Sequence, residues 1–323
     1  MNTAICTLYE GHYHYGLAAL LNSLDNKDFK GSVYVGYRGD LPKWALDMGK
    51  KHSVEPYKNS LLIEIGDDIQ VVFLELSTDY HFTNYKPNFM IELWSGPASD
   101  ADTMIYMDPD IVVSMQWSLF DEWLIHGVAL CEDINSPVHE FHPKRSNWRK
   151  YYSQHAKTLK FKSSYYVNGG FVGVRKEFKS FIFEWKELQD LMAEAIGGLS
   201  RSSLTGQQLK REATGIFAPF SKTDQDALNA TIEYTEHPTS IVGREAMGFI
   251  AGKALLPHAL GTPKPWMNKP LKKFFKGYSP RLIDKLYWKY ANGAIKSKPS
   301  GEVARKIFLT NMASFLSRLY VRK

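Results

Sequence analysis

The 323-residue sequence has few cysteines and no long apolar run. Only Cys6 and Cys131 occur, with no Cys-x-x-Cys spacing that would hold a metal ion. Each lies in an apolar stretch, so we expect two buried thiols rather than a disulfide, which favours a reducing, cytoplasmic compartment. No 18 consecutive residues are apolar, so no membrane-spanning helix is expected. Residues 1–8 lack the basic and apolar regions of a signal peptide, and we expect none.

The charge is unevenly distributed along the chain. Residues 264–323 carry 15 Lys or Arg against Asp284 and Glu302, a net +13, so the total of +6 leaves −7 on the other residues. A basic tail on an acidic body indicates an anionic partner, either phospholipid or nucleic acid. Aromatic residues alternate with the cations here, and residues 303–322 have the apolar face and flanking cations of an interfacial helix.

The first 131 residues alternate short apolar runs with helical patterns. The apolar runs predict strands at 3–7, 32–37, 70–76, 103–107 and 128–131. The helical patterns predict helices at 17–24, 42–48 and 87–94. Strands that alternate with helices indicate βαβ units, and therefore an α/β fold with a mainly parallel sheet. Residues 167–174 and 178–196 continue the pattern with one more strand and one more helix.

Residues 135–166 interrupt this pattern. The segment is rich in His, Arg, Lys and aromatic residues and shows no clean period. A long irregular insertion in an α/β domain is often a substrate loop, and these residue types suit stacking on sugars or pairing with acidic glycans. A solvated basic loop explains the composition equally well.

Asp108-Pro109-Asp110 follows the apolar run 103–107. Two carboxylates at the carboxyl end of a buried parallel strand lie where α/β sheets bind ligands. Such oxygen ligands suit Mg²⁺ or Mn²⁺, which keep positions open for phosphate oxygens. A plain turn is the alternative, because Asp-Pro-Asp is also good turn chemistry.

Three later motifs are each ambiguous alone. Gly169-Gly170 inside the strand 167–174 marks either a bulge or the close approach of a ligand. Residues 223–229, Thr-Asp-Gln-Asp-Ala-Leu-Asn, predict a helix start, with or without acids that face a cleft. Residues 257–266 place a His, a Gly and a Lys at spacings of three, which could bind a metal and a phosphate, although a lone His is more often structural.

Together the four motifs resemble a known family. Their order is Asp-x-Asp, Asn-Gly-Gly-Phe, Asp-Gln-Asp-Ala-Leu-Asn and His-x-x-Gly-x-x-Lys-Pro-Trp. This order resembles the retaining galactosyl- and glucosyltransferases that include glycogenin and bacterial lipopolysaccharide galactosyltransferases (glycosyltransferase family 8-like). The resemblance implies a GT-A (Rossmann-like) domain over residues 1–266, with a mainly parallel mixed sheet flanked by helices. Residues 267–323 would then form a basic, aromatic, helical extension that associates with membranes.

The resemblance also assigns roles around the donor phosphates. The metal ligands would be Asp108, Asp110 and His258, with Asp108 also near the donor ribose. Gly261 and Lys264 would hold the diphosphate. The metal would be Mn²⁺ (or Mg²⁺), and the donor a nucleotide sugar, expected to be a UDP-hexose.

Further roles concern the sugar and the nucleoside. Asp224 and Gln225 would lie under the transferred sugar as catalytic residues. The other donor contacts would be Lys86, Asn168 and Gly169. The candidates for the nucleoside pocket, which has no certain counterpart in the family pattern, are Thr7, Tyr9 and Tyr13. The sequence has Asn168-Gly169-Gly170 where the family usually has Asn-Ser-Gly, which leaves the base and the sugar open.

The implied activity is transfer of a hexose, with retention, to a glycan or lipid-linked glycan during surface polysaccharide synthesis. The basic tail would hold the protein on the inner face of the cytoplasmic membrane, with no nucleic acid as partner. A nucleotidyltransferase is one rival, although such enzymes open with a Gly-rich basic loop where residues 8–13 are Leu-Tyr-Glu-Gly-His-Tyr. A catalytically silent sugar-nucleotide binder and a nucleic-acid-binding protein that uses the tail are the others.

Overall fold

The structure, a computed structural model, describes residues 2–319 apart from the Lys58 side chain. Its centre is a sheet of strand order β3-β4-β5-β2-β1-β6-β8-β7-β9. The strands are β1 Thr3–Glu10, β2 Gly31–Arg38, β3 Lys50–Val54, β4 Tyr57–Ile65, β5 Ile69–Glu75, β6 Thr103–Met107, β7 Val128–Glu132, β8 Val167–Arg175 and β9 Thr239–Val242. Strands β5, β2, β1 and β6 pair in parallel, whereas β8 is antiparallel to both β6 and β7. The predicted α/β class with a mixed sheet is confirmed.

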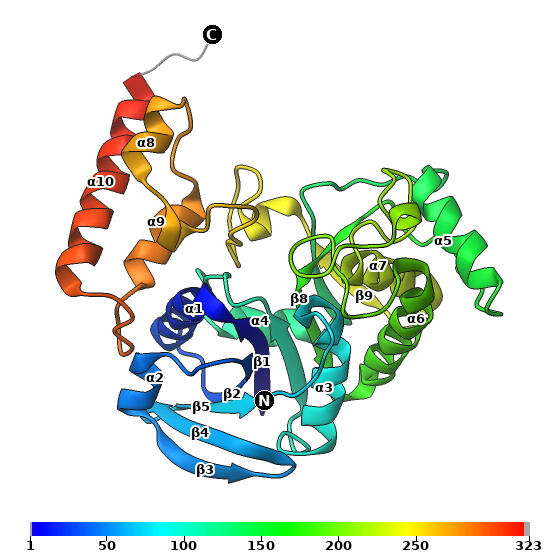
Figure 1. Cartoon of the computed structure of the whole chain (residues 1–323), viewed down its shortest axis with the longest axis horizontal. Helices are drawn as coiled ribbons and strands as arrows, with labels where there is room; N and C mark the ends of the chain where they lie inside the picture. Colours follow the sequence, from blue (N-terminus) through cyan, green and yellow to red (C-terminus); the bar gives the residue numbers. More distant parts are fainter. Residues whose placement is uncertain (1, 320–323) are drawn as a thin grey trace.

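Helices cover both faces of this sheet (Figure 1). They are α1 His14–Asn26, α2 Lys43–Met48, α3 Lys86–Ser95, α4 Ser118–Leu124, α5 Pro143–Ser153, α6 Ser180–Ile196, α7 Asp224–Tyr234, α8 Pro270–Phe275, α9 Leu282–Tyr290 and α10 Ser300–Leu319. Apolar side chains of α1, α2 and α4 form the core on one face, and those of α3, α6 and α7 form the core on the other. The sheet is therefore the middle layer of three.

The central strands are apolar throughout because both of their faces are covered. Ile5 and Cys6 of β1 point into opposite cores, and neither is exposed. This explains why β1 lacks the alternation of apolar and polar residues that a half-exposed strand has. In α1 the predicted apolar face is buried, as Leu17, Leu20, Leu21 and Leu24. Each buried leucine stabilises the fold by about 1.5–3 kcal/mol relative to an exposed one.

The strand directions gather several chain segments at one edge of the sheet. Strand β6 is parallel to β1, and β7 and β6 are both antiparallel to β8. The carboxyl ends of β1, β6 and β7 therefore lie at the same edge as the amino end of β8. Residues that directly follow β6 and β7 meet the first residues of β8 there.

The C-terminal helices form a layer beside α1. Helix α9 contacts α1, and α10 contacts both α8 and α9 (Figure 1). Asn22 of α1 donates hydrogen bonds to the carbonyls of Tyr290 and Ile295, each at 2.9 Å, and accepts one from Ile295 N–H at 2.8 Å. Between residues 2 and 319 there is no helix with the length and apolar character needed to cross a membrane.

The predicted elements up to residue 196 are confirmed in type, with shifts at their ends. The antiparallel pair β3 and β4 was not predicted. The expectation of an irregular stretch over 135–166 was wrong for residues 143–153, which form α5. Of the helix predicted over 303–322, residues 303–319 belong to α10, and 320–322 lie outside the described residues.

Candidate active site

A cavity of about 420 Å³ lies at the edge of the sheet where β1, β6 and β7 end. Residues from all four sequence motifs line it, although the motifs are spread from Asp108 to Lys264. The lining also includes the end of β1, the start of α3 at Lys86, and a loop around residues 203–205. The fold therefore brings the four motifs into one site.

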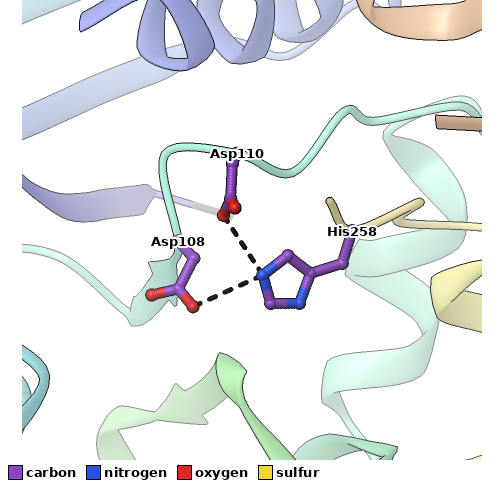
Figure 2. Close-up of side chains that lie close together, drawn as sticks. All are labelled: Asp108, Asp110 and His258. Carbon is purple, nitrogen blue, oxygen red and sulfur yellow. Dashed lines mark hydrogen bonds and ion pairs between the residues drawn. The ribbon is translucent and has the colours of Figure 1, made fainter. Parts of the chain in front are cut away.

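Three potential metal ligands converge in this cavity. One ligand atom each from Asp108, Asp110 and His258 lies within 4.8 Å of the other two. Figure 2 shows His258 Nε2 between the two carboxylates, at 3.6 Å from Asp108 Oδ2 and 3.1 Å from Asp110 Oδ1. The two aspartates stand on the turn after β6, while His258 comes from a separate segment that bridges to Ile111.

The composition of the lining fits a divalent cation. The lining contains five carboxylates and three lysines, so its formal charge is −2 when the histidines are neutral. Two carboxylates with one imidazole form a donor set that suits Mn²⁺ or Mg²⁺ better than a soft metal. The residues present therefore fit the metal that the sequence resemblance implies.

Gly170 allows these ligands to approach the backbone of β8. A Cβ at this position would lie 2.7 Å from His258 Cε1, 2.8 Å from Asp108 Oδ2 and 2.9 Å from Asn168 Oδ1. Such separations are too short for any side chain without displacement of its neighbours. Gly170, for which the sequence left open a bulge or the close approach of a ligand, lies where protein side chains approach β8 closely.

Asp110 is buried beside two basic groups. Its Oδ2 lies 2.5 Å from Lys264 Nζ, and its Oδ1 faces His258. Burial alone would raise the pKa of Asp110, but the electrostatic and hydrogen-bond contacts with His258 and Lys264 outweigh burial and hold that pKa below its usual value. The carboxyl group is therefore a charged ligand at neutral pH.

Lys86 lies between Asp108 and the start of α7. Its Nζ lies 3.4 Å from Asp108 Oδ1 and 3.0 Å from Asp224 Oδ2, and donates to the Gly169 carbonyl at 2.8 Å. Burial lowers the pKa of Lys86, yet the two carboxylates outweigh burial and raise it overall. Burial raises the pKa of Asp224, and Lys86 opposes that effect. The lysine thus stays charged between two aspartates.

Gln225 and Asn168 are oriented by backbone contacts with β8. Gly169 N–H donates to Gln225 Oε1 at 3.1 Å, and Gly170 N–H donates to Asn168 Oδ1 at 2.9 Å. Since each backbone N–H requires an acceptor, these contacts fix which amide atom faces the strand. The Oε1 atom of Gln225 therefore faces β8, where the backbone N–H of Gly169 engages it.

The segment 258–264 lines the cavity next to Asp110. Ala259 N–H donates to the Asp110 carbonyl at 3.1 Å, which ties this segment to the turn after β6. Gly261 has φ +71°, a left-handed conformation that favours glycine, and has open space around it. Lys264 Nζ donates to the Ala259 carbonyl at 2.7 Å and lies 5.4 Å from the Tyr13 ring centre. An open glycine and a lysine beside the carboxylates could hold a diphosphate.

The candidates for the nucleoside pocket are placed differently from one another. Tyr9 and Tyr13 line the cavity near the end of β1. Thr7 is completely buried in β1 and does not belong to the lining. The structure therefore brings two of the three candidates to the site, together with every other residue assigned from the motifs.

Several lining residues were missed by sequence reasoning. Asp133 follows β7 as Asp108 follows β6, and it accepts a hydrogen bond from Asn168 Nδ2 at 2.7 Å. Its place directly after an apolar strand could have identified it. His81 and residues 203–205 also line the cavity, with His81 Nε2 at 3.0 Å from Thr205 Oγ1, and no local pattern indicates them.

Comparisons with known proteins find similarity in solved structures only. No family model matches the sequence, and no curated protein is similar to it in sequence. Galactosyltransferase LgtC, solved with donor and acceptor sugar analogs, is 13% identical, with a TM-score of 0.49 over 94% of this chain and 99% of LgtC. Glycosyltransferase GlyE of Streptococcus pneumoniae TIGR4 is 13% identical, with a TM-score of 0.48 over 96% of this chain and 65% of that protein. Both of these solved structures are glycosyltransferases.

Proposed function

We propose that this chain transfers a hexose from a nucleoside-diphosphate sugar to a glycan or lipid-linked glycan, with a divalent cation bound by Asp108, Asp110 and His258. The observation that carries this proposal is the convergence of the four motifs on one cavity of about 420 Å³. A volume of this order suits a ligand of several hundred daltons. An excess of two carboxylates provides the charge that a divalent cation would balance.

The lining suggests how the donor would lie. The nucleoside would contact Tyr9 and Tyr13, and the diphosphate would lie against the segment that carries Gly261 and Lys264. The sugar would then reach Asp224 and Gln225 at the start of α7. When bound, Mn²⁺ or Mg²⁺ would supply Lewis-acid stabilisation of the leaving diphosphate.

The side chains supply the rest of the proposed chemistry. Lys264 contributes a second positive charge beside the leaving group, and removal of such a donor typically lowers kcat about 10²- to 10³-fold. Gln225 Oε1 is engaged by Gly169 N–H and an amide is barely basic, so we do not assign Gln225 as a nucleophile. Retention would then follow from attack on the face that the diphosphate leaves, with Asp224 orienting the sugar hydroxyls.

Membrane association is a separate part of the proposal. Lys269, Lys272 and Lys276 lie in and beside α8 and are exposed, near Phe275 at 80% and Tyr278 at 62% exposure. We call these five residues the α8 surface. Exposed aromatic and cationic side chains together favour an anionic lipid surface. The protein would act on the inner face of the cytoplasmic membrane, in surface polysaccharide synthesis.

A donor panel tests the proposed activity. UDP-, GDP- and dTDP-hexoses would be incubated with the full chain in Mn²⁺ or in EDTA, and release of the nucleoside diphosphate would be measured. We expect turnover of a UDP-hexose that requires the metal and falls at least 100-fold in Asp110→Asn. Turnover that is equal in EDTA, or undiminished in the variant, would contradict the metal assignment.

A further inference from the structure

Asp226, the residue after the proposed catalytic pair, is held by an enclosed set of hydrogen bonds. It is completely buried and does not line the cavity. Its Oδ1 accepts from Lys144 Nζ at 3.0 Å and from Tyr166 Oη at 2.8 Å. Its Oδ2 accepts from Lys144 Nζ at 3.0 Å and from Lys222 N–H at 2.7 Å. A carboxylate this deep is tolerated only with such partners, so the four contacts fix its position.

The backbone directly before the catalytic pair is strained. Thr223 has φ +40° and ψ −114°, a conformation that a β-branched residue rarely adopts. Lys144 contacts residues on both sides of it, since its Nζ also donates to Ser221 Oγ at 2.9 Å. A strained residue persists only where its surroundings determine its conformation. Lys144, from α5, is one of the groups that do so.

We propose that Lys144 is a positioning residue, which sets the direction of Asp224 and Gln225 through its contacts with Asp226 and Ser221. This rests on the proposed function, in which those two residues face the transferred sugar. The metal and diphosphate ligands belong to other segments, the turn after β6 and residues 258–264. Loss of Lys144 should therefore impair turnover without weakening nucleotide binding.

The far end of α7 provides a matched control, because α5 holds that end too. Arg145 Nη1 lies 2.5 Å from Glu233 Oε1, and Arg149 Nε lies 2.9 Å from Glu233 Oε2. Arg149 does not line the cavity. Substitution of Arg149 removes a contact between the same two helices, but at the end of α7 that does not carry Asp224 and Gln225.

Kinetics of Lys144→Met and Arg149→Met in the full chain test the inference. With UDP-galactose and UDP-glucose as donors and Mn²⁺ present, we expect kcat of Lys144→Met to fall about 10- to 100-fold, as small misplacements at a reacting centre do. The Kd for UDP with Mn²⁺ should stay within twofold, and Arg149→Met should keep both constants within twofold. Equal kcat losses in the two variants, or a UDP affinity that falls with kcat, would overturn the inference.

Amide hydrogen exchange tests the positioning without any donor. The reporting amides are Thr223, which donates to the Phe220 carbonyl at 3.0 Å, and Gln225, which donates to the Lys222 carbonyl at 3.1 Å. We expect faster exchange over residues 221–227 in Lys144→Met and not in Arg149→Met. Unchanged exchange there would overturn the positioning role. If the wild-type chain consumes no donor, the proposed function fails, and the exchange result still decides the role of Lys144.

Discussion

Basic residues play different parts in the cavity and in the C-terminal helices. In the cavity, the side chains of Lys86 and Lys264 are 3% and 10% exposed, and each contacts an aspartate. On the α8 surface, Lys269, Lys272 and Lys276 are exposed beside aromatic side chains. Buried, paired cations fix geometry, whereas exposed ones are free to meet an external anionic group. The two regions should therefore respond to different substitutions.

The largest effect should follow from Asp108→Asn. Loss of one carboxylate removes a proposed metal ligand and a contact of Lys86, so we expect kcat for donor turnover to fall at least 100-fold. Asp284→Asn is the control in the tail, because Asp284, like Asp108, accepts contacts from neighbouring side chains, here Asn268 and Arg281. It should lower the free energy of unfolding by about 1–3 kcal/mol while kcat is kept. Full activity in Asp108→Asn would remove the distinction between the regions.

Substitution of the three exposed lysines should affect only membrane binding. Each lysine near an anionic surface contributes about 1 kcal/mol, so replacement of all three by Gln should weaken partitioning onto phosphatidylserine-containing vesicles about 100-fold. Donor turnover in solution should not change. The matched control replaces exposed lysines of the body by Gln, namely Lys43, Lys50 and Lys51. Equal losses in the two triple variants, measured by vesicle co-sedimentation, would show that overall charge and not the α8 surface is responsible.

These substitutions are preferable to deletion of the tail. Asn22 of α1 is hydrogen-bonded to Tyr290 and Ile295, and Trp266 and Tyr287 belong to one apolar cluster with Ala19 of α1. A deletion would leave this surface of α1 uncovered and would alter the body as well as the tail.

Gly170→Ala should weaken metal binding without removal of any ligand. The added Cβ would displace His258 or Asp108. Changes around metal ligands typically cost 10- to 100-fold in metal affinity. Titration of Mn²⁺, followed by electron paramagnetic resonance, measures this directly. Retention of wild-type affinity would show that the ligands do not bind in the arrangement described.

Gly301→Ala is the counterpart in the tail and should have the smallest effect. Gly301 lies in the first turn of α10, and no atom outside its own stretch of helix lies within 4 Å of the added Cβ. An alanine in a helix loses less conformational entropy on folding, so we expect stabilisation by about 0.5–1 kcal/mol and no change in metal affinity. Thermal or urea unfolding gives the value. Destabilisation would mean that α10 does not continue through this residue.

The sequence predicts which residues lie at the binding edge of the sheet better than it predicts which helices pack next to that edge. Asp108 follows an apolar strand, and strand direction alone places it at the binding edge; the same reasoning extends to Asp133. The role of α5 could not be predicted in this way. Its contacts with α7 join residues as far apart as Arg145 and Glu233, and its composition suggested a solvated or sugar-binding loop. Ion pairs between distant segments leave no local pattern.

The proposed catalytic pair, Asp224 and Gln225, was likewise predicted only in part. A helix start at Thr223 was predicted from capping chemistry, and α7 does begin at Asp224, but the predicted cap was wrong, since the Thr223 side chain makes no capping hydrogen bond. That Asp224 and Gln225 reach the cavity depends on a strained Thr223 and on contacts with β8 and Lys86, which spacing cannot reveal. Only the family resemblance indicated it. Thr7 shows the converse, since the resemblance made it a candidate for the nucleoside pocket, whereas the structure buries it in β1 and it does not line the cavity.

Nucleotide binding, measured by thermal shift with and without metal, tests the central claim most directly. UDP, GDP, dTDP and CMP would each be added to the full chain in Mn²⁺ and in EDTA, with Asp108→Asn in parallel. At a hundredfold excess over its Kd, a ligand that binds only the folded protein stabilises it by about 2.7 kcal/mol. We expect a shift of that size with UDP in Mn²⁺, lost in EDTA and in the variant. If none of the nucleotides shifts the wild-type transition in Mn²⁺, the cavity does not bind the proposed donor and the glycosyltransferase proposal is wrong.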